Sequence, residues 1–170
     1  ADAKEAETRL VCYDVTDGLS GNVVNAVLQD QVGFIWLGGD TGLDRFDGKR
    51  FRHYDLPAVT SLVEDGNGVI WAGTTGGLYY LPENRSEVRR FLVETQFDVM
   101  ISAKINDLEI EESGDMWIAT EGQGVFLYND EKQSLTQFSR HISIATTLDL
   151  FSGGCVFVCA EEGSVFSLTE

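Results

Sequence analysis

Proline, cysteine and basic residues are scarce in this sequence, and the shortages of cysteine and of basic residues each argue against a class of protein. Only 2 prolines and 3 cysteines occur among 170 residues. An odd number of cysteines, none of them in a CxxC spacing, argues against a disulfide framework or a zinc site. Lysine and arginine number 12 against 28 acidic residues, which gives a formal net charge of −16. Such a chain repels polyanions, so nucleic acid and anionic membrane surfaces are poor partners.

Long apolar runs are also missing, since no stretch approaches the roughly 20 residues that a membrane-spanning helix needs. The chain starts at Ala1 without a signal-peptide pattern, which fits either a removed leader or a trimmed sequence. What is present is 43% hydrophobic residues and 18 glycines. This content is sufficient for a folded core, and the many glycines favour short strands joined by tight turns.

A motif of tryptophan and glycine recurs four times and is the strongest pattern in the chain. Each copy places a glycine three residues before an aromatic anchor, which is Trp36, Trp71, Trp117 or, in the weakest copy, Phe157. An array with such a period is built of supersecondary units. Each unit contains four candidate strands separated by turns, as in a β-propeller blade.

We therefore predict an all-β fold, a β-propeller of four-stranded antiparallel blades with about four repeats in one segment. The expected repeats are residues 15–55, 56–92, 100–139 and 142–170, with an extra strand at 9–14. Helical repeats fit poorly, because glycine interrupts every candidate helix. A sandwich or an up-and-down barrel stays open as an alternative, although neither would require a repeated tryptophan. In a propeller, the anchor is expected to fill the wedge between neighbouring blades.

The repeats are out of phase with the ends of the sequence. The last copy stops after its third strand, whereas Leu10–Tyr13 has the pattern of a fourth strand placed before the first copy. We expect this N-terminal strand to complete a blade from the far end of the ring, which would hide open edges. The four repeats either close on themselves or form an arc of a larger ring. An arc would favour pairing with the remaining blades or with a second protomer as a homodimer.

Two long stretches carry a family resemblance. GLSGNVVNAVLQDQVGFIWLGGDTGLDRFDGKRFRHYD (Gly18–Asp55) and VTSLVEDGNGVIWAGTTGGLYYL (Val59–Leu81) resemble two-component regulator propeller repeats. Such repeats build the periplasmic sensor region of hybrid two-component systems, with a histidine kinase and a response regulator, in glycan-degrading bacteria. The resemblance implies an arc of a seven-bladed ring, a periplasmic location outside the inner membrane, and oligosaccharide sensing. Kinase activity would then lie elsewhere in the full-length protein.

The sequence offers no candidate for catalysis. The motifs GxSxG, HExxH and the P-loop are absent. Asp65-Gly66-Asn67-Gly68 resembles a calcium loop but lacks the closing glutamate, and it fits a hairpin turn better. We predict no catalytic residue, no metal ligand and no cofactor, and therefore no enzyme activity in this segment.

Ligand-binding residues are expected on loops that a rigid scaffold holds in place. In a propeller, the loops after the second and the fourth strands share one face. We predict a site for a neutral sugar on this face, lined by Asp40, Thr75, Phe97, Asp98, Glu121 and Gln123, although solvated loop tips would show the same residues. The favoured function is ligand sensing. The alternatives are a protein-interaction scaffold without a small ligand and a polysaccharide-acting propeller enzyme.

Overall fold

The protein is an arc of antiparallel blades in the computed structural model, which describes residues 10–92, 101–139, 142, 144–151, 155–161 and 163–169. The first blade contains β1 (Val24–Gln29), β2 (Ile35–Gly39), β3 (Gly42–Phe46) and β4 (Phe51–Tyr54). The second contains β5 (Val59–Glu64), β6 (Ile70–Thr74), β7 (Gly77–Leu81) and β8 (Arg89–Arg90). The third contains β9 (Ile105–Ile110), β10 (Met116–Thr120), β11 (Val125–Asn129) and β12 (Ser134–Ser139). The fourth contains β13 (Ala145–Phe151), β14 (Cys155–Ala160) and β15 (Val165–Thr169).

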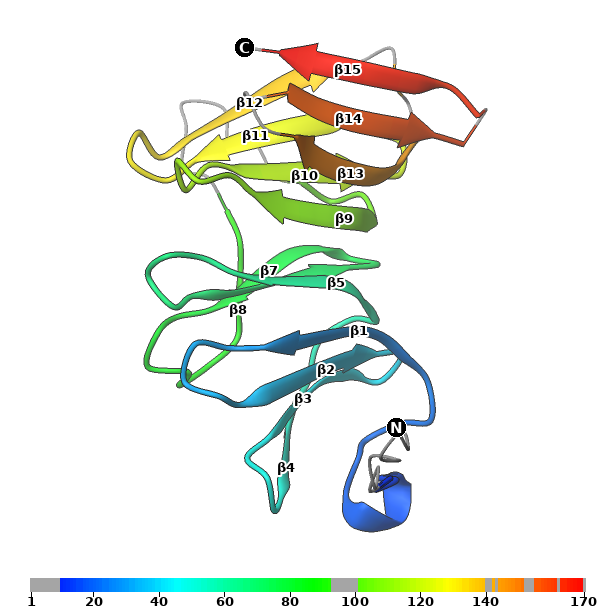
Figure 1. The fold of residues 1–170 in the computed structure, drawn as a ribbon, viewed down its shortest axis with the longest axis vertical. Coiled ribbons are helices and arrows are strands. Elements are labelled where there is room, and N and C mark those ends of the chain that lie inside the picture. Colours follow the sequence, from blue (N-terminus) through cyan, green and yellow to red (C-terminus); the bar gives the residue numbers. More distant parts are fainter. Residues whose placement is uncertain are drawn as a thin grey trace, which may run out of the picture.

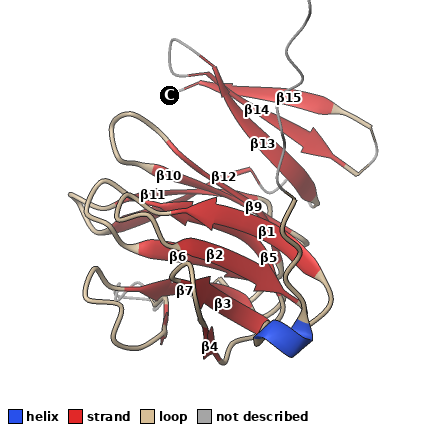
Figure 2. Ribbon diagram, turned by 60° about the horizontal axis from the view of Figure 1, so that its bottom comes forward, coloured by secondary structure: helices blue, strands red, loops and turns tan. Residues whose placement is uncertain are grey.

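The blades stand in a row in chain order, and their innermost strands β1, β5, β9 and β13 pack side by side (Figure 1). The first and the fourth blades lie at opposite ends of this row, so the ring does not close on itself. Strands and loops account for nearly all of the part that is described, beside a single 3-10 turn, Val15–Asp17, next to the first blade (Figure 2). The prediction of a propeller arc with about four repeats is confirmed.

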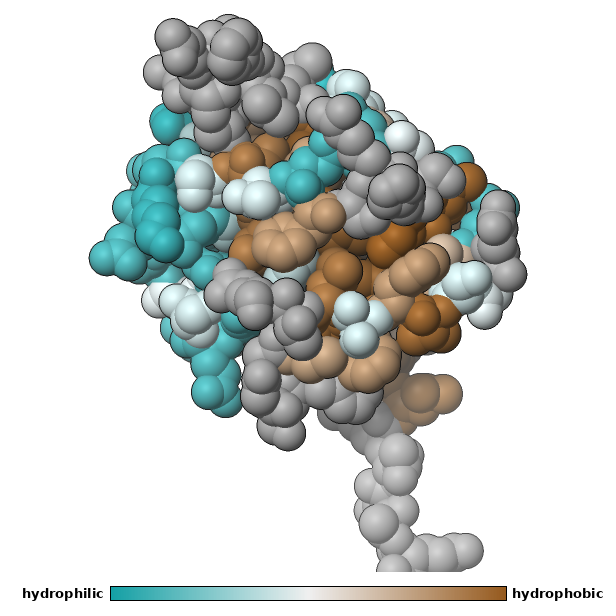
Figure 3. Space-filling model, turned by 90° about the horizontal axis from the view of Figure 1, so that it is seen from above, coloured by the Kyte–Doolittle hydropathy of each residue, from teal (hydrophilic) through white to brown (hydrophobic). Residues whose placement is uncertain are grey.

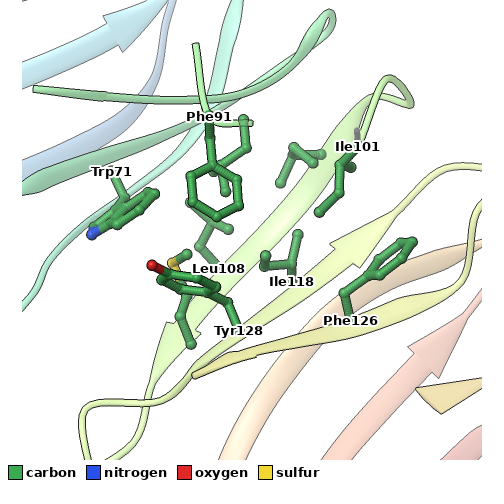
Figure 4. Packing of buried hydrophobic residues seen from close by; sticks show 10 residues of the cluster. Trp71, Phe91, Ile101, Leu108, Ile118, Phe126 and Tyr128 are labelled. Carbon is green, nitrogen blue, oxygen red and sulfur yellow. The ribbon is translucent and has the colours of Figure 1, made fainter. Parts of the chain in front are cut away.

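Each interface between blades holds its own hydrophobic cluster, centred on one anchor tryptophan. Trp36 lies between the first and second blades, Trp71 between the second and third, and Trp117 between the third and fourth, all at least 94% buried. At the middle interface, Trp71 meets Tyr128 of the next blade with a ring-centroid separation of 5.7 Å (Figure 4). The anchors therefore act as wedges between blades, as the repeat predicted.

Each anchor also has a polar partner that the repeat alignment did not identify. The indole Nε1 of Trp36 donates to Asp30 over 2.8 Å, and that of Trp71 donates to Asp65 over 2.9 Å. Glu111 accepts from Trp117 in the same way. In every case the acid stands six residues before the tryptophan and begins the hairpin turn between the first two strands. Position 151, six residues before Phe157, is a phenylalanine, so the fourth copy has exchanged both members of the pair.

Two positions of the motif require glycine, each for a different steric reason. The glycine three residues before the anchor has a positive φ, which is 103° at Gly33 and 76° at Gly68, as the turn requires. The glycine two residues after the anchor lets the next blade approach. A Cβ added at Gly38 would lie 2.3 Å from Val59 Cγ1, so that position has no room for a side chain.

The N-terminal segment differs from the prediction. Residues 10–14 form no strand, and Leu10 is 91% exposed. Tyr13 instead rests on Phe46 and Phe51 of the first blade, with ring centroids 4.8 and 6.0 Å away. A strand needs an edge to pair with, and the three-stranded fourth blade lies at the far end of the arc. Completion of that blade by the N-terminus of a closed ring stays a prediction.

Candidate functional site: an axial cavity shared by four blades

A cavity of about 700 Å³ opens at the inner side of the arc, where all four blades meet. Three positions of the repeat supply its walls, one just before the inner strand, one within that strand, and one in the turn between the second and third strands. The first position gives Ala58, Lys104 and Ile144. The second gives Asn25, Thr60, Asn106 and Thr146. The third gives Asp40, Thr75, Glu121 and Glu161.

Inner-strand residues at the second position bind one blade to the next. Asn25 Nδ2 donates to the carbonyl of Val59 over 3.0 Å, and Asn106 Nδ2 donates to that of Ala145 over 2.8 Å. Thr60 makes the equivalent bond through its hydroxyl. These three donors are committed to the scaffold. The asparagine side-chain oxygens and the turn residues are therefore the groups on which a ligand would depend.

Acidic side chains dominate the turn position. Asp40, Glu121 and Glu161 are exposed carboxylates at the cavity, and among the described residues Lys104 is the one basic residue that lines it. Lys104 Nζ lies 2.9 Å from Glu121 Oε2, and both side chains are more than 40% exposed, so the pair is a weak surface ion pair. The cavity retains an excess of negative charge. It therefore favours ligands rich in hydrogen-bond donors, such as hydroxyl groups, and repels anionic ones.

The structure brings together three of the six predicted site residues. Asp40, Thr75 and Glu121 share the axial cavity. Gln123 lies outside its lining, because its side-chain oxygen accepts from the backbone N–H of Ala103 over 3.0 Å. Phe97 and Asp98 lie outside the described residues.

Sequence reasoning missed the four inner-strand residues of the cavity, Asn25, Thr60, Asn106 and Thr146. A signal for them existed, because an asparagine or threonine stands eleven residues before every anchor. A polar residue retained at one strand position in every copy indicates a face that solvent or a ligand reaches.

One serine, aspartate and histidine constellation lies apart from this cavity, in the first blade. Ser20 Oγ donates to Asp44 Oδ2 over 2.6 Å, and His53 Nδ1 lies 3.1 Å from Asp44 Oδ1. The serine thus contacts the carboxylate and not the imidazole of His53, the one histidine in the described part of the chain, whereas a nucleophile of the triad type needs an imidazole to take its proton. The network fixes the segment before β1 against β3. Within the described residues, no group of three or more side chains could hold a metal ion, and no helix is long and apolar enough to cross a membrane.

Blades of four antiparallel strands around a shared axis define the chain as part of a β-propeller. Comparison with protein families indicates which kind of propeller repeat the first two blades resemble. Residues 18–41 and 55–76, which lie in the first two blades, match the model described as two component regulator propeller. A comparison with curated proteins found no match.

Solved structures with the same fold include extracellular domains from B. thetaiotaomicron. That of the putative hybrid two component system BT3049 is 18% identical, with a TM-score of 0.81 over 94% of this chain. That of the putative hybrid system BT4673 is 20% identical, with a TM-score of 0.70 over 89% of this chain. PorZ, a surface component of the type-IX secretion system of Porphyromonas gingivalis, is 12% identical, with a TM-score of 0.76 over 92% of this chain. This chain spans 25%, 22% and 27% of their lengths, respectively.

Proposed function

We propose that this chain is a ligand-sensing part of the extracytoplasmic region of a hybrid two-component system. In this proposal it lies in the periplasm and binds a neutral oligosaccharide in the axial cavity without turning it over. The observation that carries the proposal is the convergence of one turn residue and one inner-strand residue from every blade on a single cavity of about 700 Å³. The propeller repeats and the likeness to extracellular sensor domains support the signalling context.

The chemistry of the lining supports an uncharged, hydroxyl-rich ligand. Carboxylates accept hydrogen bonds from hydroxyl groups, and bonds to a charged group contribute about 1.5–3 kcal/mol each. A cavity made from four blades also changes shape when the blades shift against one another. A bound ligand would therefore bias blade packing, which is a means of passing a signal to a kinase.

Calorimetry on the purified chain tests the proposal, after a panel of neutral and acidic oligosaccharides has been screened for saturable binding. We expect a neutral member to bind and its uronic acid counterpart to bind less tightly. Asp40→Ala and Glu121→Ala should each weaken binding about tenfold or more, as the loss of a charged acceptor implies. The matched control is Glu87→Ala, at an exposed position outside the cavity.

Unchanged affinity in both cavity variants would refute the assignment of the site. Degradation of the bound oligosaccharide would instead identify a polysaccharide-acting enzyme. If no oligosaccharide of the panel binds saturably, the proposal that the axial cavity binds a neutral oligosaccharide is refuted.

A second candidate function, a protein-interaction platform, is favoured by the two ends of the arc. Positions that other blades bury completely are exposed there. Val165 on β15 is 60% exposed, whereas its counterparts Leu43 and Leu78 are at most 1% exposed. Figure 3 looks onto this end and shows apolar side chains across the face. The occupant that this proposal names is a second protomer or the remaining blades of a sensor ring.

A further inference from the structure

At the interface of the first and second blades, an arginine fills the space beside the acid–indole pair. Arg85, in the loop after β7, is 92% buried. Its Nη2 donates to Asp30 Oδ2 over 3.0 Å and to Glu64 Oε1 over 3.3 Å. Asp30 Oδ2 is the same atom that accepts the Trp36 indole. The acid of the first blade thus holds an indole from its own blade and a guanidinium from the next.

At the interface of the second and third blades, the corresponding side chain is a glutamine that turns away. Arg85 and Gln133 are the two non-glycine residues with positive φ in the described chain, at 48° and 49°. Both follow the third strand of their blade, and each backbone N–H donates to the carbonyl three residues earlier. Gln133 Nε2 donates to Asp130 Oδ1 and to its carbonyl, within its own turn, over 2.9 and 2.7 Å.

The result is a pocket of about 410 Å³ beside Asp65. Asp65 Oδ1 accepts from the backbone N–H groups of Asn67 and Val69, while Oδ2 accepts only from the Trp71 indole among the described residues. The atom that binds arginine at the previous interface is therefore available here. The pocket lies at the rim of the hairpin turns before β6, whereas Thr75 of the axial cavity follows β6 at its other end.

Aromatic rings form much of the remaining wall of this pocket. Arg90 also lines it, but its Nη2 donates over 3.0 Å to the carbonyl of Gly76, in the turn at the other end of β6. Trp71, Tyr80, Phe91 and Tyr128 line it, and Trp71 meets Phe91 and Tyr128 at centroid separations of 5.2 and 5.7 Å (Figure 4). Burial above all, with the hydrogen bond to Asp130, raises the pKa of Tyr128, so its hydroxyl stays protonated at neutral pH. Electron-rich rings next to the carboxylates of Asp65 and Asp130 suit a guanidinium or an ammonium group, through cation–π contact and stacking.

We propose that this interblade pocket binds the cationic end of an external ligand, an arginine side chain or an alkyl guanidine or amine, in the place that Arg85 occupies one blade earlier. The fold itself contains the template, since Asp30 with Arg85 shows what the acid of this repeat accepts. The net charge of −16 draws cations to the molecule. This site is separate from the axial cavity, and neither proposal depends on the other.

The probes are Nα-acetyl-arginine methylamide and the uncharged citrulline analogue of the same shape, added to ¹⁵N-labelled protein. The three tryptophans give three indole N–H signals, each of which reports one interface. We expect the arginine compound to shift the Trp71 signal saturably and to leave those of Trp36 and Trp117 in place. The citrulline compound should bind at least tenfold more weakly, because it lacks the charge.

Two exchanged variants test the pocket by filling it and by recreating it at the other interface. Gln133→Arg should fill the pocket from within, abolish the shift of Trp71 and raise the melting temperature. Arg85→Gln should open the equivalent pocket at the first interface, so that the Trp36 signal also moves with the arginine compound. The proposal is overturned if the arginine compound leaves Trp71 unshifted in the natural sequence, if citrulline binds equally well, or if Gln133→Arg binds as before.

Discussion

The aspartates that precede Trp36 and Trp71 by six residues have two duties. Asp30 accepts from the backbone N–H groups of Val32, Gly33 and Phe34, which shapes the hairpin turn, and it also accepts the indole of Trp36. Aspartate is common in turns for the first reason alone, so the sequence pattern indicated only a turn. The second duty depends on where the indole points, which the repeat spacing does not reveal. The joint replacement by Phe151 and Phe157 in the fourth copy was the available signal.

A pH dependence follows from Asp30. Burial alone would raise the pKa of this carboxyl, but hydrogen bonds from Trp36 and from the backbone of Phe34, together with Arg85, outweigh burial and hold the pKa below its ordinary value. A group with a lowered folded pKa adds stability above its unfolded pKa of about 3.9, and that stability is lost as the pH falls through the folded value. We expect the free energy of unfolding to decrease below about pH 4.

Chemical denaturation between pH 7 and pH 3 measures this effect. Asp30→Asn should be less stable at pH 7 by roughly 1.5–3 kcal/mol, the usual contribution of a hydrogen bond to a charged group, because Arg85 then keeps only Glu64 as a carboxylate partner among the described residues. The variant should also lose less stability on acidification than the natural sequence. Equal pH dependence in the two proteins would contradict the role assigned to Asp30.

At the scale of strands, the repeat predicted most of the architecture because each blade repeats the same local demands. A positive-φ glycine, a buried aromatic and alternating apolar residues recur in each of the first three blades, and all three formed four strands. Residues 10–14 form no strand in the open arc, because pairing needs a free edge nearby and the edge of the three-stranded blade lies at the other end. Pairing of this segment in a closed ring stays a prediction. A local pattern cannot carry information about such distances.

The candidate site was predicted in part for a related reason. Asp40, Thr75 and Glu121 were identified because topology alone places the turns after the second strand on one face. The inner-strand residues required knowledge of which strand face points to the axis. The interblade pocket could not be predicted, because it exists where the side chain of Gln133 turns away from Asp65, and no sequence motif records a missing contact.

A prediction at this scale concerns the bonds that join inner strands. Asn106→Ala removes the donor that holds the carbonyl of Ala145 in the fourth blade. We expect it to lower the free energy of unfolding by about 1 kcal/mol, the usual net contribution of one hydrogen bond. Thr146→Ala is the matched control, because the hydroxyl of Thr146 donates over 3.0 Å to Cys159 within its own blade.

Hydrogen exchange at the backbone of β13 distinguishes the two variants. Asn106→Ala should speed exchange in β13 relative to β5, whereas Thr146→Ala should leave the difference between these strands small. Faster exchange in both strands equally would show that Asn106 supports the whole molecule and not the link between two blades.

For the whole molecule, the two ends of the arc present complementary surfaces. The face of β1 carries Val24 and Val27, which are 41% and 65% exposed, where Val59 and Leu108 in other blades are at most 2% exposed. The opposite end carries Phe157 and Val165. Each end therefore has the surface that an adjoining blade normally covers, and exposed apolar faces of this kind indicate an interaction site.

We expect the chain to form a homodimer in which each end of one copy meets the other end of its partner. Val165→Asp should weaken this dimer at least tenfold, because burial of one valine side chain contributes about 1.5–3 kcal/mol. Val32→Asp is the control, since Val32 is 69% exposed at a hairpin turn where the second and third blades also expose their residue. Sedimentation equilibrium over a range of concentrations measures both. A monomer at every concentration would contradict the homodimer.

At the strand position eleven residues before the anchor, the bonds between inner strands run from each blade to the one that follows it, whereas Thr147 and Leu148 of β13 donate back to Asp107 of β9. Asn25, Thr60 and Asn106 donate forward, and the carbonyls of Val59, Ile105 and Ala145 accept from behind. The arc therefore has a direction, because at each interface the preceding blade donates this bond and the following blade accepts it. Two like ends brought together would oppose donor to donor or acceptor to acceptor. Any blade that extends this arc, whether from the same chain or from another, has to have the same orientation, so that a donor meets an acceptor at the new interface.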